Sequence, residues 1–415
     1  MSPAPAQSAS SSPTQDSWTR SAAVDFFRGL GLWIVFLDHI DPNVWSRLTL
    51  WRFGFSDFAE VFIFLSGFIG VGSYERALTS GQASGVMGKL LRRVARLYVA
   101  HVASLTLSLV VLGAFAERGL RLAVPSMYVW MQDPAKYLWR LLALTYAPHF
   151  FSLLPLYIVV SPVLLLAAVG LRRAPKLTLC ISGGLWLASQ FPAFDSRVLT
   201  SGVWSFHPLA WQFLFVLGAA VRYYANRLQS LAQSPWVIRS AAAVVAGTVA
   251  LKSLTHFPWA LHRMGEHLHG MLLRDSGKAE LAPYRLVHFL ALLILVHACT
   301  RNRRRWLQSF VARLAIVCGI DSLFIYACTL VLDTGASLIL AGTRGGAVLQ
   351  LELILFGLAL LCGMAWLRRG NVHLRFSLGG VSPVKFEAAS SRTTSGPLAN
   401  GLRAIPQPAR TRDAD

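Results

Sequence analysis

Long apolar runs recur along this chain, and they constrain its fold more than any other feature. About ten of them approach the roughly 20 residues that an α-helix needs to cross the hydrocarbon core of a bilayer. Of the 415 residues, 54% are apolar and 14% are charged, whereas a soluble domain carries about 25% charged residues. This composition excludes a soluble globular protein, a disordered chain and a disulfide-stapled secreted module. We therefore predict an all-α fold, that of a polytopic membrane protein.

The chain divides into a membrane part and two polar tails. Residues 1–19 and 371–415 are rich in Ser and Pro, a composition that predicts disorder. Residues 20–370 form the predicted transmembrane domain, with no room for a soluble domain between the spans. We place the spans at roughly 24–40, 58–74, 94–115, 150–170, 177–192, 208–225, 236–255, 284–300, 318–340 and 347–367.

Basic side chains gather in short clusters between the spans. The net charge is +20, but the clusters are spread along the chain, so we expect no nucleic-acid partner. When the loops are numbered from an intracellular N-terminus, the even-numbered loops and their flanks hold most of the clusters. This bias marks the side of the bilayer that faces the cytoplasm, and it predicts that both termini are cytoplasmic.

The first span carries the most ionisable side chains, and such groups inside a membrane are functional candidates. Arg28 and His39 are eleven residues apart, so on an α-helix they share one face and lie about 16 Å apart along the axis. This geometry suits a long donor with phosphate groups: an Arg can bind phosphate, and a His can remove a proton from a hydroxyl. Asp38 and Asp41 could orient the His39 ring. The alternative is that Arg28 only reaches toward the interface and His39 only ends a helix.

The second span begins with two acids on one helix face, Asp57 and Glu60. We expect Glu60 to lie inside the membrane, where it needs a partner or a water-filled cavity, and His39 or Arg52 could be that partner. Acids also occur at helix N-termini because they complement the helix dipole, and for Asp57 both interpretations stay open.

These residues resemble a known group of membrane enzymes. Arg28, ten further residues and His39 are similar to the Arg-x10-His signature of the acyltransferase-3 group. The wider sequence resembles the OpgC branch of that group, in order along the chain, at Asp25-Phe26-Phe27-Arg28-Gly29, Asp38-His39-Ile40, Gly54-Phe55-Ser56-Asp57, Ser66-Gly67, Leu91-Arg92-Arg93, Arg96-Leu97-Tyr98, Leu154-Pro155-Leu156-Tyr157, Trp211-Gln212, Gly218, Arg285, His288-Phe289-Leu290-Ala291 and Ser322-Leu323. The chain departs from that pattern at His207, where we expect an Asn, and at Asp321, where a His or Gln is usual.

The resemblance implies a ten-span enzyme of the bacterial inner membrane. It would transfer an acyl group, succinyl by the resemblance, from a coenzyme A thioester to osmoregulated periplasmic glucans or a related glycan. His39 would be the catalytic residue and Arg28 would help to hold the donor. Acyl-CoA would be a substrate, with no permanently bound cofactor, and glucan-synthesis proteins are possible partners besides the lipid bilayer.

Further residues are candidates for parts of this site. Asp38 and Glu60 join His39 as catalytic candidates, and Asp57 joins those that bind the acceptor or the acyl group. Arg92, Arg93 and Arg96 could bind the coenzyme's phosphates, although membrane topology explains them equally well. The acceptor or the acyl group could also meet Trp211, Gln212, Arg285 and His288. Their plainer alternatives are an interfacial anchor for Trp211 and a pair with Glu280 for Arg285.

The loop at 256–283 contains four histidines and Glu266. A metal site is conceivable, but no supporting ligands around it are evident, so we expect no metal. The histidines are His256, His262, His267 and His269.

Two other functions use the same features. A proton-coupled transporter could use Asp38, His39, Glu60 and Arg28 as a relay, and paired discontinuous helices in two halves would support it. The sequence shows no such pairing. A scaffold for glucan-synthesis proteins is the third possibility.

Overall fold

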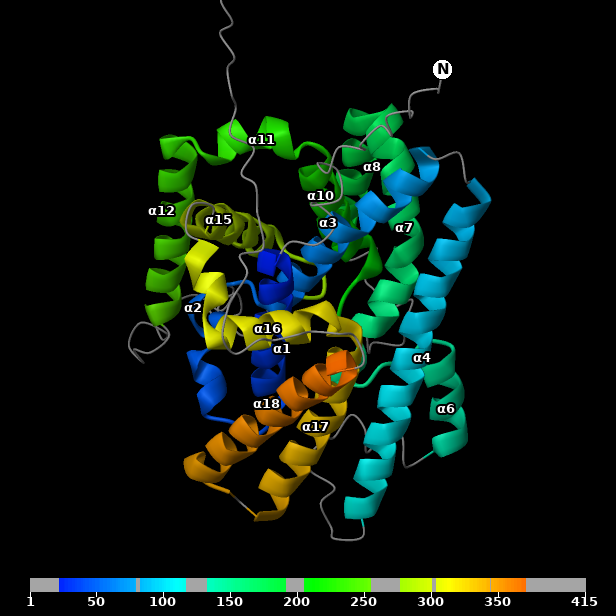
Figure 1. Cartoon of the computed structure of the whole chain (residues 1–415), viewed down its shortest axis with the longest axis vertical. Coiled ribbons are helices and arrows are strands. Elements are labelled where there is room, and N and C mark those ends of the chain that lie inside the picture. The colour runs from blue at the N-terminus through cyan, green and yellow to red at the C-terminus, as the bar shows by residue number, and fades with distance from the viewer. Residues whose placement is uncertain are drawn as a thin grey trace, which may run out of the picture. The chain divides into compact units, whose positions relative to one another are not determined.

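A computed structural model describes residues 22–79, 83–116, 133–191, 205–254, 277–300, 304–343 and 345–370. Across these ranges the chain forms helices, turns and loops, with no β-strand. The all-α prediction is therefore confirmed for the described residues (Figure 1). Both predicted tails and residues 255–276 of the histidine-bearing loop lie outside them.

Each predicted span overlaps one long helix, and the ninth also overlaps the end of a shorter helix. These helices are α1 (Ala22–His39), α3 (Phe58–Thr79), α4 (Ala83–Ala116), α7 (Leu153–Arg173), α8 (Pro175–Ala188), α10 (Pro208–Tyr223), α12 (Pro235–Ser253), α15 (Pro283–Thr300), α17 (Ser322–Thr343) and α18 (Ala347–Gly370). Shorter helices lie between them: α2 (Leu50–Phe53), α6 (Pro134–Leu142), α11 (Ala225–Ala232) and α16 (Phe310–Ile320).

Among the described residues, seven helices are long and apolar enough to cross a membrane: α3, α4, α7, α12, α15, α17 and α18. By contrast, α8 and α10 have only 14 and 16 residues, and α1 carries Asp25, Arg28 and Asp38 within 18 residues. Large apolar side chains face outward, for example Leu166 at 69% exposure and Trp366 at 60%, as expected of a lipid-covered surface. The count of ten spans stays a prediction.

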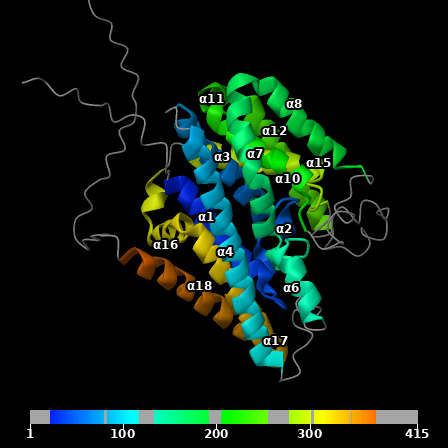
Figure 2. The same cartoon turned by 90° about the vertical axis from the view of Figure 1, so that its right-hand side faces the viewer.

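The ninth predicted span is wrong at its start. We placed it at 318–340, but the helix ends at Ile320 and a new one begins at Ser322, with Asp321 between them. The preceding helix, α16, has 11 residues and is too short to cross a bilayer. It packs against α1 instead, which Figures 1 and 2 both show.

Glycines allow two helix pairs to approach closely. A Cβ added to Gly29 of α1 would meet the carbonyl group of Ala315 in α16, and one on Gly319 would meet the carbonyl group of Asp25. In the same way, Gly67 of α3 lies against the backbone of α10, and Gly218 of α10 lies against the carbonyl group of Phe64. Small residues are typical of such close contacts in membrane proteins.

The helices α1 and α17 run side by side in the same direction. The Arg28 guanidinium donates to Ser322 Oγ near the start of both helices. Further along, His39 Nδ1 lies 3.2 Å from Asp333 Oδ2. Both pairs join residues 294 positions apart in sequence, so the two helices keep one register over this length.

The glycine packing predicts opposite effects of two alanine substitutions. We expect Gly218→Ala to lower the free energy of unfolding by about 1–3 kcal/mol, because the methyl group overpacks the contact with α3. Gly247 of α12 has open space around its Cα, so Gly247→Ala should be neutral or stabilising. Unfolding of each purified variant in detergent measures its free energy of unfolding. An equal decrease in the two variants would contradict the packing argument.

Candidate active site

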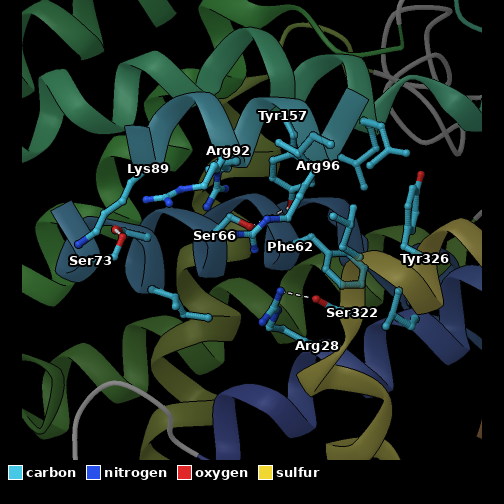
Figure 3. A pocket seen from close by; sticks show the side chains of 18 of the residues that line it. Arg28, Phe62, Ser66, Ser73, Lys89, Arg92, Arg96, Tyr157, Ser322 and Tyr326 are labelled. Carbon is cyan, nitrogen blue, oxygen red and sulfur yellow. Dashed lines mark hydrogen bonds between the residues drawn. The ribbon is translucent and has the colours of Figure 1, made fainter. Parts of the chain in front are cut away.

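A cavity of about 660 Å³ lies among α1, α3, α4, α7 and α17. Among the described residues that line it, five are basic and none is acidic: Arg28 from α1, and Lys89, Arg92, Arg93 and Arg96 from α4. Figure 3 shows Lys89, Arg92 and Arg96 on one side of this basic cavity and Arg28, bonded to Ser322, on the other. The structure thus brings together the four arginines that we predicted to bind the donor, and it adds Lys89.

The α4 cations meet because of their spacing. Positions 92 and 93 are adjacent, and each lies three or four residues from both 89 and 96, which places all four on one face of a helix. Arg93 is half-buried and its Nε donates to Ser161 Oγ at 3.3 Å, whereas Lys89, Arg92 and Arg96 are exposed. This face can therefore offer several charged donors to one anionic ligand.

Arg28 is partly buried in the wall of the basic cavity. Its side chain is 25% exposed, it donates to Ser322, and its Nη1 is 4.0 Å from Asp25 Oδ1. These contacts give Arg28 partners within the protein, and its role toward a donor or toward the interface stays a prediction.

A second cavity, of about 430 Å³, is lined by His39 together with Asp38, Asp41, Asp57 and Lys278. Phe62, Leu153 and Tyr326 line both this His39 cavity and the basic cavity. Arg28 and His39 therefore face two adjoining cavities, where the sequence predicted a single common one.

The His39 ring is held between two side chains. It stacks on Phe150, with ring centroids 4.1 Å apart, and its Nδ1 lies 3.2 Å from the buried carboxylate of Asp333. Asp38 lines the same cavity, and its Oδ1 accepts a hydrogen bond from Thr49 Oγ1 at 2.7 Å, so the role of Asp38 toward this ring stays a prediction. Sequence reasoning missed Asp333, although an acid inside an apolar span was a signal that could have found it.

A buried group of charges lies beside the His39 cavity. Nε and Nη2 of Arg285 lie 2.9 Å and 2.7 Å from Glu60 Oε1, and Lys278 Nζ lies 2.8 Å from Asp57 Oδ2. The expected partners were wrong: Glu60 pairs with Arg285 rather than with His39 or Arg52, and Arg285 does not pair with Glu280. Because Glu60 and Arg285 line neither cavity, we assign them to holding α3 and α15 together.

The two acids also begin α3 in the manner of a capping box. Asp57 Oδ1 accepts from the Ala59 amide at 2.8 Å, and Glu60 Oε2 accepts from the Asp57 amide at 2.9 Å. Burial by itself would raise the pKa of Asp57, but the cations of Lys278 and Arg285 outweigh it and lower that pKa well below its usual range. Asp57 is therefore a carboxylate at neutral pH and keeps Lys278 at the cavity wall.

The remaining predicted acceptor residues are buried and bonded within the protein. Trp211 Nε1 donates to the carbonyl groups of Lys278 and Ala279, at 2.9 Å and 3.1 Å. Gln212 exchanges hydrogen bonds of 2.8 Å with Ser182. Trp211 is 0% exposed, so the expectation that this residue meets the acceptor or the acyl group is not met in this structure.

His288 is also bonded within the protein, to Ser56. Its Nδ1 accepts from the Ser56 amide at 3.3 Å and lies 2.7 Å from Ser56 Oγ. It therefore fixes the segment just before Asp57 and does not line either cavity.

Two other sequence expectations concern His207 and the histidine-bearing loop. His207 caps α10, because its Nδ1 accepts from the Leu209 amide at 3.1 Å, a role that an Asn could also fill. His256, His262, His267, His269 and Glu266 lie outside the described residues. Within the part that the structure describes, no group of three His, Cys, Asp or Glu residues is placed to hold a metal ion.

The buried charges predict a large effect of removing one partner. Arg285→Ala should lower the free energy of unfolding by about 3–5 kcal/mol, because it leaves the Glu60 carboxylate buried without its cation. Replacing both residues, as Glu60→Gln with Arg285→Leu, should recover much of that loss.

The control is Arg239→Ala, which removes an exposed guanidinium on α12. We expect little change there, measured in the same detergent unfolding experiment. An Arg285→Ala protein as stable as the Arg239→Ala protein would contradict the structural role of this pair.

Comparison with protein families gives one match. A family model described as OpgC protein matches residues 20–371. The search of curated proteins and the search of solved structures each found no match.

Proposed function

The chain belongs to the OpgC family, which is associated with acyltransferases that modify glucans, and we propose that it is a membrane-embedded O-acyltransferase. The donor in this proposal is cytoplasmic acyl-CoA, with succinyl-CoA as the first candidate. The acceptor is a hydroxyl group of a periplasmic glucan or a related glycan. The enzyme would lie in the inner membrane of a bacterium, with the basic cavity toward the cytoplasm.

The observation that carries this proposal is the pairing of two unlike cavities. Of the described lining residues, five cations and no acid face the basic cavity, whereas His39, three carboxylates and Lys278 face the adjoining one. Coenzyme A has the matching asymmetry, because its phosphate groups lie at one end and its thioester at the other. Arginine suits the phosphate end, since its planar fork binds phosphate oxygens bidentately.

The path between the cavities gives the donor its orientation. With its phosphates among Arg28 and the α4 cations, the pantetheine arm would pass Phe62, Leu153 and Tyr326, which line both cavities. These side chains suit an uncharged arm, because two of them are fully apolar. The thioester would then reach the His39 cavity.

The chemical step in this proposal uses His39 as a base. The imidazole takes the proton of the acceptor hydroxyl while that oxygen attacks the thioester carbonyl carbon. The carbon–sulfur bond breaks, and the departing thiolate receives the proton from the imidazolium. One acyl-CoA and one hydroxyl thus give one ester and free coenzyme A.

Buried charges also allow the transporter alternative, but the structure places one member of its relay elsewhere. Its relay needs Glu60 to exchange protons with His39, but Glu60 is paired with Arg285 and lines neither cavity.

A substitution of the proposed base tests the reaction. His39→Ala should lower kcat for acyl transfer by about 10²- to 10⁴-fold, because general-base catalysis contributes about that much. Release of thiol from succinyl-CoA in the presence of a glucan, with mass spectrometry of the glucan, measures it. His297→Ala, which removes an exposed histidine of α15, is the control. Wild-type succinylation by the His39→Ala protein would overturn the proposal.

The α4 cations can be tested separately from the chemistry. The double variant Arg92→Gln, Arg96→Gln should raise KM for acyl-CoA at least about tenfold with a smaller change in kcat, because it removes charge-assisted bonds to phosphate. Arg172→Gln with Arg173→Gln removes two exposed arginines at the end of α7 and serves as the matched control. Equal KM values in the two double variants would show that the α4 cations serve membrane topology alone.

A further inference from the structure

The structure assigns a role to Asp333 of α17: we propose that it is the positioning residue that orients His39 for proton transfer. The effect of Asp333 on catalysis rests on the proposed function. The contact between Asp333 and His39 does not, since it follows from the geometry of α1 and α17.

The environment of Asp333 sets it apart from the other acids. Its side chain is 2% exposed in a helix that is otherwise apolar or hydroxyl-bearing, where a carboxylate is expensive to bury. Its side-chain partners are His39, 3.2 Å from Oδ2, and Thr334, whose Oγ1 lies 3.5 Å from Oδ1. The neighbouring threonine is a local contact, so His39 is the partner that another helix supplies.

The contact between His39 and Asp333 is one of two contacts that join α1 to α17 in the same register. Ser322 and Asp333 are eleven residues apart on α17, the same separation as Arg28 and His39 on α1. Because both pairs are in contact, α17 holds the two ends of the α1 motif at once. A rigid helix that fixes both ends also fixes the distance between the basic cavity and the His39 ring.

A second contact from α17 reaches the same ring indirectly. Tyr326 lies on the stripe between Ser322 and Asp333, and its hydroxyl donates to the carbonyl group of Phe150 at 3.1 Å. Phe150 in turn stacks on His39. The ring is thus fixed in its plane by Asp333 and across its face by Phe150.

The chemistry follows from which nitrogen is engaged. A carboxylate at Nδ1 favours the tautomer in which Nδ1 carries the hydrogen, so Nε2 keeps a free electron pair. That pair can accept the proton of the acceptor hydroxyl. The carboxylate then stabilises the imidazolium until the thiolate takes the proton away, as in serine hydrolases.

The test begins with Asp333→Asn, which keeps the shape of the side chain and removes its charge. We expect kcat for succinyl transfer to fall at least about tenfold while KM for succinyl-CoA stays near the wild-type value. Asp333→Glu restores the charge at a shifted position and should give a kcat between those of the Asn variant and the wild type. Thr329→Val is the matched control, because Thr329 is a buried polar residue of α17 that bonds only its own helix.

Two further measurements separate positioning from stability. In the His39→Ala background, Asp333→Asn should cause no additional loss of kcat, since its effect runs through the missing ring. Diethyl pyrocarbonate modifies neutral imidazole, and mass spectrometry can follow its reaction at His39 without any acyl transfer. We expect Asp333→Asn to lower that rate constant and Thr329→Val to leave it unchanged.

The outcomes distinguish this proposal from the proposed function. Unchanged kcat and an unchanged modification rate in folded Asp333→Asn would overturn the role of Asp333. If Asp333→Asn does not fold, Asp333→Ser, which removes the carboxylate and keeps a hydroxyl group, takes its place, and unchanged values of kcat and of the modification rate in Asp333→Ser would overturn the role of Asp333. If the wild-type protein transfers no acyl group, the proposed function fails, and the modification rate still decides whether Asp333 orients His39.

Discussion

Water is scarce between packed membrane helices, so an ionisable side chain there is stable only when a neighbouring helix offers it a partner. In this protein that requirement links helices that are far apart in sequence. Arg28 and His39 of α1 meet Ser322 and Asp333 of α17, and Glu60 of α3 meets Arg285 of α15. The charges thereby join α1 to α17 and α3 to α15.

The same requirement separates two kinds of charged residue. Glu60 and Arg285 neutralise each other away from both cavities, so they contribute to stability and to the position of Asp57. Arg28 and the α4 cations instead line a cavity whose described lining residues include no acid, which favours an anionic ligand there. Sequence alone presents both kinds as charges within apolar runs, and only their partners distinguish them.

Much of what could be predicted from the sequence is local in the chain. The common face of Arg28 and His39 and the pairing of Asp57 with Glu60 at a helix start follow from helical periodicity, and the structure has both. Partners such as Asp333 and Arg285 lie 294 and 225 residues along the chain from the groups they bind. Helical periodicity predicts only which residues share a face of one helix, so it cannot predict a contact between helices so far apart in sequence. The burial of Trp211 was missed for the same reason, because its indole is covered by the distant segment at Lys278 and Ala279.

The length of α4 has a consequence for how a soluble molecule reaches this protein. Its 34 residues extend about 51 Å, whereas the hydrocarbon core is about 30 Å thick. The charged turns from Lys89 to Arg96 lie near one end of α4, so a bilayer that covers its apolar remainder would leave them in the headgroup layer. Under the proposed function, the phosphate groups of the donor would then bind at the bilayer surface, and only the uncharged portion of the donor would need to enter the low-dielectric interior.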